Sequence, residues 1–417
     1  MSELATTRSG WRRFVRSDGF VSILAVVLAL VIGGLLIAFT NPNVQATMGY
    51  FFAKPADFFA EAWYTVTSAY AAMFRGAVYN YQATDFLGAI NPLSETLTQA
   101  TPLITAALGV AVAFRAGLFN IGAQGQIILG AAVGGYIGFA IHLPGPLHIL
   151  LVVIGSMVGG AVWAGLAGWL KARTGAHEVI VTIMLNYVAT YLLAWLLLTP
   201  LMQRPGSSDP VSPQIDASAF YPLLVPGTNL RVHFGFIIAI AATLVTSWLL
   251  SRSKLGFQLR AVGANPGAAR SAGMSVAMAT VVAMAIAGAL AGLSGAAQVS
   301  GTEHVVVEGI AATIGFDAIT VALLGRSKPL WVFLSALLFG AFRAGGVVMQ
   351  TDTGTPVDIV LVVQSLIVLF IAAPALTRRI FMIRDSKRTP KKPSVAKAVA
   401  AEPAKAPAEA PAEGATR

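Results

Sequence analysis

The sequence predicts an all-α integral membrane protein, a polytopic bundle of about ten transmembrane helices with both termini in the cytoplasm. Three observations lead to this prediction. Hydrophobic residues make up 56% of the 417 positions and charged residues only 11%, whereas soluble domains carry about 25% charged residues. The apolar residues fall in long stretches, and the cations gather between those stretches. The chain has no cysteine, which excludes disulfides and thiolate metal sites.

Ten stretches are long and apolar enough to cross a bilayer, whose core of about 30 Å needs about 20 apolar residues per helix. The first stretch follows Arg12, Arg13 and Arg16, so a secretory signal is the alternative to a membrane anchor. Its long apolar core and the lack of a small-x-small cleavage site favour the anchor. The predicted spans are 20–39, 97–114, 118–141, 148–170, 179–200, 233–251, 275–297, 309–325, 330–350 and 357–376.

Lysine and arginine predict the orientation of these spans, because cytoplasmic segments of membrane proteins carry an excess of both. With the N-terminus inside, 23 of the 28 cations fall in inside segments, ten of them from Thr377 onward. Arg343 falls within a span, and the outside segments hold only Lys54, Arg75, Arg204 and Arg231. The net charge of +10 therefore indicates a lipid bilayer and no nucleic acid as the surroundings of the chain.

The same pattern divides the chain into segments. We expect residues 1–19 to be a cytoplasmic N-terminus and residues 20–376 a transmembrane domain. Residues 48–80 have apolar side chains at helical spacing, which predicts an amphipathic helix on the outer membrane surface; a short re-entrant span is the alternative. The proline-rich residues 201–232 are predicted to be an irregular outer loop. The basic, Ala- and Pro-rich residues 377–417 are predicted to be a disordered cytoplasmic tail.

Motifs for catalysis are absent from the sequence. The phosphate loop GxxxxGK[ST] is missing, since the dipeptide Gly-Lys never occurs. His177 and Glu178 open no HExxH motif, and no GxSxG nucleophile elbow is found. The five histidines are scattered. We therefore expect no catalytic residue, no metal site and no cofactor in this chain.

Residues 252–274 form the longest predicted cytoplasmic connection and contain a short helix of their own. Asn265 can cap the first turn with its side chain, and Pro266 suits the first helical position. Gly273 can adopt the left-handed conformation that ends a helix. A helix of about two turns has little stability alone, so it is either a rod that docks into a partner or an ordinary capped turn.

Two groups of polar side chains fall within predicted spans. Such side chains normally face the bundle interior or a wet cavity. Asn120, Gln124 and Gln126 stand among glycines, so their amides either line a solute path or form hydrogen bonds between helices. Thr182 and Asn186 are four residues apart and share one helix face. With Tyr187, they either contact a solute or make structural hydrogen bonds.

Asp317 and Arg343 are charged residues in consecutive antiparallel spans. Counted at 1.5 Å per residue, both lie about 10–12 Å below the outer surface. Equal depth predicts an ion pair, because pairing is the usual way in which a buried charge is tolerated. Direct contact with a solute is the alternative.

Five stretches of the sequence resemble the permeases of bacterial nucleoside importers of the ATP-binding-cassette (ABC) superfamily, a group related to permeases for ribose-type sugars and branched-chain amino acids. They spread over most of residues 90–375 in one order. This chain departs from the family pattern at Gln124, where the family usually has Glu. The stretches are FRAGLFNIGAQGQ (114–126), HEVIVTIMLNY (177–187), GANPGAAR (263–270), GFDAITVALLGR (315–326) and GGVVMQ (345–350).

The resemblance implies a permease subunit in the bacterial plasma membrane that carries nucleosides. It implies three partners: an ATPase that uses ATP, a second permease subunit in a heterodimer, and an extracellular substrate-binding lipoprotein. It also favours the docking interpretation of residues 252–274, since this loop falls where the family docks its ATPase. The coupling residues would then be Gly263, Asn265, Pro266, Ala268, Ala269, Arg270 and Gly273.

Other functions remain open at this point. A permease for branched-chain amino acids or sugars fits the same residues. A stand-alone secondary transporter is disfavoured, because no two-fold inverted repeat and no row of intramembrane carboxylates is visible. A membrane scaffold would have little need for so many intramembrane amides.

Overall fold

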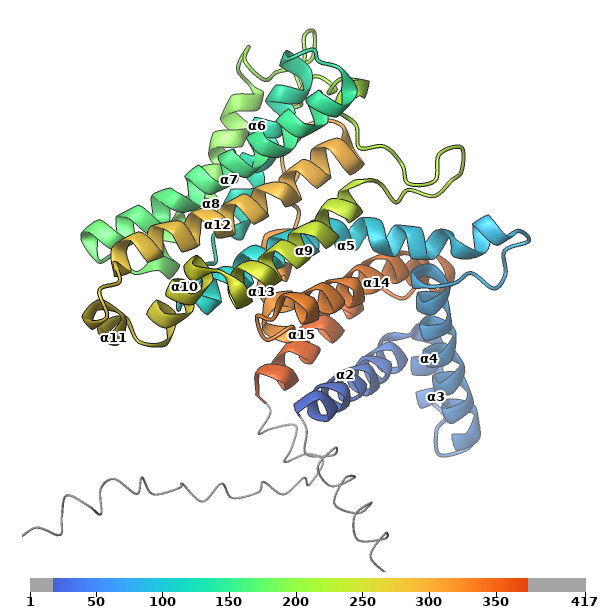
Figure 1. The fold of residues 1–417 in the computed structure, drawn as a ribbon. Coiled ribbons are helices and arrows are strands. Elements are labelled where there is room, and N and C mark those ends of the chain that lie inside the picture. Colours follow the sequence, from blue (N-terminus) through green and yellow to red (C-terminus); the bar gives the residue numbers. More distant parts are fainter. Residues whose placement is uncertain (1–17, 374–417) are drawn as a thin grey trace, which may run out of the picture.

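The computed structural model describes residues 18–373, so the predicted tail and nearly all of the predicted N-terminal segment lie outside the described residues. Within residues 18–373 the regular elements are helices, and extended pairing is limited to two isolated bridges. Most helices run side by side along one direction (Figure 1). The predicted fold class, a polytopic all-α membrane protein, is confirmed.

Each predicted span overlaps a helix. Side chains cap several of them: Asp85 accepts from Gly88 N at the start of α5, and Ser275 accepts from Met278 N at the start of α12. The helices are α2 (Asp18–Thr40), α3 (Pro42–Met48), α4 (Pro55–Ala77), α5 (Phe86–Arg115), α6 (Ala123–Ala140), α7 (Gly145–Thr174), α8 (Glu178–Leu197), α9 (Gly235–Arg252), α10 (Lys254–Ala264), α11 (Pro266–Ser271), α12 (Val276–Ala296), α13 (Ile314–Leu324), α14 (Pro329–Thr353) and α15 (Asp358–Ala372).

Seven helices of the described part are long and apolar enough to cross a membrane: α2, α5, α7, α8, α9, α12 with the π-helical turn that follows it, and α14. The helix α13 has only 11 residues, which gives about 16 Å, roughly half of a bilayer core. It starts five residues later than the predicted span 309–325, because residues 304–313 are not helical. In that stretch His304, Gly309 and Ala312 adopt left-handed backbone angles, which a continuous right-handed helix cannot contain.

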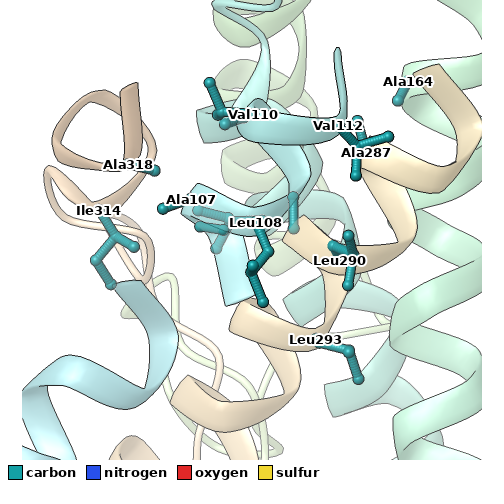
Figure 2. Packing of buried hydrophobic residues seen from close by; sticks show 14 of the residues in the cluster. Ala107, Leu108, Val110, Val112, Ala164, Ala287, Leu290, Leu293, Ile314 and Ala318 are labelled. Carbon is teal, nitrogen blue, oxygen red and sulfur yellow. The ribbon is translucent and has the colours of Figure 1, made fainter. Parts of the chain in front are cut away.

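The core lies where α12 packs between α5, α6 and α7 (Figure 1). Glycines bring these backbones together: a Cβ on Gly160 would lie 2.2 Å from the carbonyl oxygen of Gly288, and a Cβ on Gly292 would lie 2.0 Å from that of Ser156. Lipid provides no hydrophobic driving force between helices, so these contacts depend on the close van der Waals packing that small residues allow. Figure 2 shows Leu108 of α5 and Leu290 of α12 in the adjoining apolar cluster.

The helix α4 runs across the direction of α5 rather than along it (Figure 1). Its buried face, which includes Ala69 and Ala72, packs against α14. Its other face exposes Trp63 and Tyr64, with 74% and 68% of their surface accessible. This arrangement fits the amphipathic helix predicted within residues 48–80, and its position on the outer membrane surface stays a prediction.

Residues 204–223, named the strap here, cover the non-helical stretch that precedes α13. Ser212 N donates to Val306 O at 3.0 Å, Ile215 N to His304 O at 3.0 Å, and Tyr221 N to Ser300 O at 2.8 Å. Backbone groups at membrane depth must find partners inside the protein. The strap supplies these partners, and it forms the greater part of the loop predicted at 201–232.

Candidate functional site

The amides predicted to line a solute path lie at the start of α6. Asn120 and Gln126 are both 1% exposed. Their amides exchange two hydrogen bonds, of 3.1 and 3.2 Å, and Asn120 Oδ1 also accepts from Gly122 N at 2.9 Å. The side chain of Asn120 thereby satisfies a backbone N–H that the first turn of α6 leaves free.

Asn186 of α8 joins the same cluster from the side. Its Oδ1 accepts from Gly125 N at 2.9 Å, and its Nδ2 donates to Ile121 O at 2.9 Å. Thr182 lies against Gly122, and its hydroxyl donates to Glu178 O. Tyr187 is not part of the cluster, since its side chain turns outward and is 60% exposed.

Gln124 connects α6 to α13. Its Nε2 donates to Ala312 O at 2.6 Å, and its Oε1 accepts from Gly315 N at 2.9 Å in the first turn of α13. The starts of two helices therefore meet at one side chain. An amide serves both bonds, because it carries a donor and an acceptor. An ionised Glu, the residue usual in the resembling family, could serve only the second.

The two charged residues of α13 and α14 lie together. The guanidinium of Arg343 contacts the carboxylate of Asp317. Thr313 completes the group: its hydroxyl accepts from Arg343 Nη2 at 2.7 Å and donates to Asp317 Oδ2 at 3.0 Å. Arg343 also lines the cavity described below, so the pair reaches from the start of α13 to that cavity.

The short helix predicted in the loop 252–274 is α11, and the geometry predicted for its ends is confirmed. Asn265 Oδ1 accepts from Ala268 N at 3.1 Å, Pro266 occupies the first turn, and Gly273 has φ +80°. Ala269 is buried, whereas Arg270 and the other residues of α11 are exposed. The helix therefore projects as a short rod at the predicted cytoplasmic end.

Gly263 packs the segment before α11 against the end of α5. It stands in α10, directly before α11, and a Cβ there would lie 2.4 Å from Arg115 O and 2.7 Å from Gly117 N. Gly117 has φ +74°, which only glycine adopts without strain. The backbone of α10 therefore rests on the turn between α5 and the amide cluster.

A polar cavity of about 570 Å³ opens at the predicted outer end, between α4, α5 and α14. Arg75 contacts Asp352, and Arg231 lies 3.4 Å from Glu95. The amide oxygen of Asn91 is buried without a partner. The polar and charged residues that line the cavity are Arg75, Asn80, Gln82, Asn91, Glu95, Gln99, Arg231, Arg343, Thr351 and Asp352.

Sequence reasoning missed this cavity except for Arg343. Its residues come from three parts of the chain that are distant in sequence, residues 75–99, Arg231 and residues 343–352, and none of its polar residues lies in the five stretches that carry the resemblance. One signal was available: Asn91, Glu95 and Gln99 recur every four residues in a stretch that is helical, so they share one face of α5. The predicted span began at residue 97, which left two of the three outside it.

Two histidines lie beneath the strap, one buried and one half-buried. His233, just before α9, is 1% exposed; its Nδ1 accepts from Gly235 N, and its Nε2 has no partner. Burial lowers the pKa of His233 to about 4, with smaller contributions from the nearby His304 and Arg231. Burial also lowers the pKa of His304, whose ring stacks on Phe220. Both imidazoles are therefore neutral at pH 7.

Comparison with known proteins identifies the family. Residues 93–372 match the family described as branched-chain amino acid transport system / permease component. The guanosine ABC transporter permease protein NupP of Bacillus subtilis is 35% identical over 355 residues, which cover 85% of this chain and 92% of the relative. The nucleoside ABC transporter permease protein NupB of Lactococcus lactis is 36% identical over 73% of this chain and 87% of the relative.

A third relative carries a different name. The glucose ABC transporter permease protein TsgB13 of Haloferax volcanii is 32% identical over 86% of this chain and 88% of the relative. No solved structure matches the chain. The family match covers well over half of the chain, and these relatives cover most of it. The chain therefore belongs to the branched-chain amino acid type of ABC transporter permeases and is a multi-pass membrane protein of that family.

Proposed function

We propose that this chain is the permease subunit of an importer that carries nucleosides across the plasma membrane of a bacterium. A separate ATPase supplies the energy by hydrolysing ATP, a second permease subunit completes the path, and an extracellular lipoprotein delivers the solute. The assignment of nucleosides as the substrate depends on the similarity to two nucleoside permeases, over 85% and 73% of the chain.

The outer cavity supports a neutral, hydrogen-bonding solute. Each of its three arginines already has a carboxylate partner: Arg75 has Asp352, Arg231 has Glu95, and Arg343 has Asp317. An arginine that is paired with a carboxylate attracts an ionic solute less strongly than an unpaired one. The amides of Asn91 and Gln99 are then the natural partners for hydroxyl groups and base edges. A volume of about 570 Å³ lies within the range of small-molecule sites.

The contacts between helices support coupling of this cavity to an ATPase. Arg343 at the cavity bonds to Thr313 and Asp317 at the start of α13. At the end of α13, Ser327 O accepts from Arg115 Nε at 2.9 Å. Arg115 in turn adjoins the contact with Gly263, directly before α11. A push on α11 thus has a continuous mechanical path to the cavity.

Glucose is the second candidate, because the glucose permease covers as much of this chain as the guanosine permease does. Both solutes are neutral and rich in hydroxyl groups, so the charge balance of the cavity admits either. They differ in the flat aromatic base, which only a nucleoside has.

The test is uptake into vesicles that contain the chain together with an ATPase, a second permease and a substrate-binding protein from the same organism. Labelled guanosine, adenosine, uridine, glucose and leucine are offered with and without ATP, and a matched preparation lacks the ATPase. Nucleoside uptake that requires both ATP and the ATPase is the expected result. Uptake of glucose or leucine instead would contradict the assignment of nucleosides as the substrate, but it would agree with an ATP-driven importer. Uptake that continues without the ATPase would overturn the energy source.

A further inference from the structure

A second cavity, of about 310 Å³, lies at the predicted cytoplasmic end, where α5, α9 and α10 meet the start of α14. It is distinct from the outer cavity and from α11. Three cations line it: Arg115, Arg260 and Lys328. Ser247 and Ser251 also line it, and Ser251 Oγ donates within α9 to Ser247 O at 2.6 Å.

The charge of this basic cavity is not compensated. No carboxylate of the described residues lines it. Arg115 and Arg260 donate only from Nε, to Ser327 O and to Gly256 O. These carbonyls are neutral, so both guanidinium charges remain available to an anion. In the outer cavity, by contrast, each arginine has a carboxylate partner.

The start of α14 adds to the positive potential. Lys328 precedes the helix and gives no side-chain cap, and Pro329 begins the first turn. The N–H groups of the first turn of a helix lack partners within the helix and carry the positive end of its dipole. At this helix they add to the field of the three cations that line the same cavity.

Two apolar side chains at the start of α14, Leu330 and Trp331, also line the cavity. Leu330 and Trp331 of α14 are 57% and 60% exposed, and Trp248 of α9 is 60% exposed. Both helices are long and apolar enough to cross the membrane, so these surfaces face acyl chains. Tryptophan is enriched where a span meets the headgroup layer. The cations thus stand at headgroup depth beside a surface for hydrocarbon.

We propose that this cavity binds the phosphate of an anionic phospholipid from the cytoplasmic leaflet. Arg115, Arg260 and Lys328 hold the phosphodiester, and an acyl chain lies along Leu330 and Trp331. A fixed anion between α10 and α14 would hold the loop that leads to α11 against the membrane. Basic pockets between helices on the cytoplasmic side suit such headgroups.

The test is a lipid titration of the purified full-length chain in detergent, followed by native mass spectrometry. Phosphatidylglycerol should bind more tightly than phosphatidylcholine. The double variant Arg260→Gln with Lys328→Gln should bind phosphatidylglycerol about 30-fold more weakly, since each cation near the surface attracts anionic lipid. Arg173→Gln, which removes an exposed cation of α7 at the same end, should bind as the unchanged chain does.

Three outcomes would overturn the proposal. An equal loss in Arg173→Gln would mean that only the overall charge attracts the lipid. Displacement of the lipid by millimolar inorganic phosphate, with equal retention of phosphate, would assign the cavity to a soluble anion. If lipid binding is unchanged in the double variant while less ATPase copurifies with it, the cavity instead takes an acidic side chain of that partner.

Discussion

Asp317 and Arg343 show at the scale of single residues how a membrane core tolerates charge. Each side chain keeps about a fifth of its surface exposed, 19% and 20%, so removing one partner leaves the other largely desolvated. A lone buried charge costs several kcal/mol, whereas removing both charges can cost little. The pair also connects α13 to α14, so it holds two helices together as well as neutralising two charges.

We predict that Asp317→Asn and Arg343→Gln are strongly non-additive. Each single variant should lower the thermal unfolding midpoint of the purified protein, and the double variant should lower it by less than the sum. The expected interaction is about 0.5–3 kcal/mol. The matched control is Arg231→Gln. It removes a more exposed arginine charge, which pairs with Glu95 at 3.4 Å. Strictly additive losses would show that the pair does not stabilise the fold.

His233 predicts a pH dependence of stability. Its pKa is lowered from 6.5 to about 4 in the folded protein, so between these values the unfolded chain binds the proton and the folded chain does not. Stability is therefore full above pH 6.5 and falls as the pH drops toward 4, by at most about 3 kcal/mol. The groups that face the ring are Tyr221, Arg231 and His304.

Thermal unfolding midpoints measured from pH 7.5 to pH 4.5 check this dependence. His233→Gln stays neutral and should flatten the curve, leaving the smaller contribution of His304. His304→Gln should remove only that smaller contribution, since burial lowers the pKa of His304 as well. A slope that survives His233→Gln unaltered would assign the dependence to other groups.

At the scale of elements, the contact of α7 with α12 depends on glycine. We predict that Gly160→Ala destabilises the protein by about 1–3 kcal/mol, the usual cost of overpacking, because its Cβ would lie 2.2 Å from Gly288 O. Gly165→Ala in the same helix has nothing nearer than Ala285 Cβ at 4.0 Å and should be neutral or stabilising. Unfolding midpoints in detergent measure both. Equal midpoints would mean that the helices separate to accommodate the methyl group at no cost.

The helix α11 gives a prediction about coupling. Deleting residues 265–272 should abolish ATP-dependent uptake and leave the amount of protein in the membrane unchanged, because only Ala269 of this segment is buried. Gly267→Ala, whose Cβ would meet only Asn265 Oδ1 at 3.3 Å, is the control that should retain uptake. Uptake assays in vesicles, with membrane protein quantified in parallel, decide the matter. Undiminished uptake after the deletion would leave α11 without a role in coupling.

At the scale of the whole molecule, the helical pattern was readable from the sequence because lipid demands apolar stretches of a fixed length. The caps of α11 were readable too, since Asn265 and Pro266 have local preferences. The short helix α13 was not, because residues 309–325 are apolar apart from Asp317 and two threonines, and hydropathy does not register backbone angles. The outer cavity was not, because Arg75, Arg231 and Asp352 meet only through tertiary packing. Gln124 drew attention as an amide, but its connection to Ala312 depends on that same packing.

The shortness of α13 has a consequence for the synthesis of the protein. A segment of 11 helical residues is too short to be held in lipid as an independent span, and the backbone of residues 304–313 would be unsatisfied there. The strap and Gln124, which satisfy that backbone, come earlier in the chain. We therefore expect residues 304–327 to remain beside the insertion machinery until α5, α6 and the strap have assembled. The order of the segments along the chain thus doubles as an order of assembly.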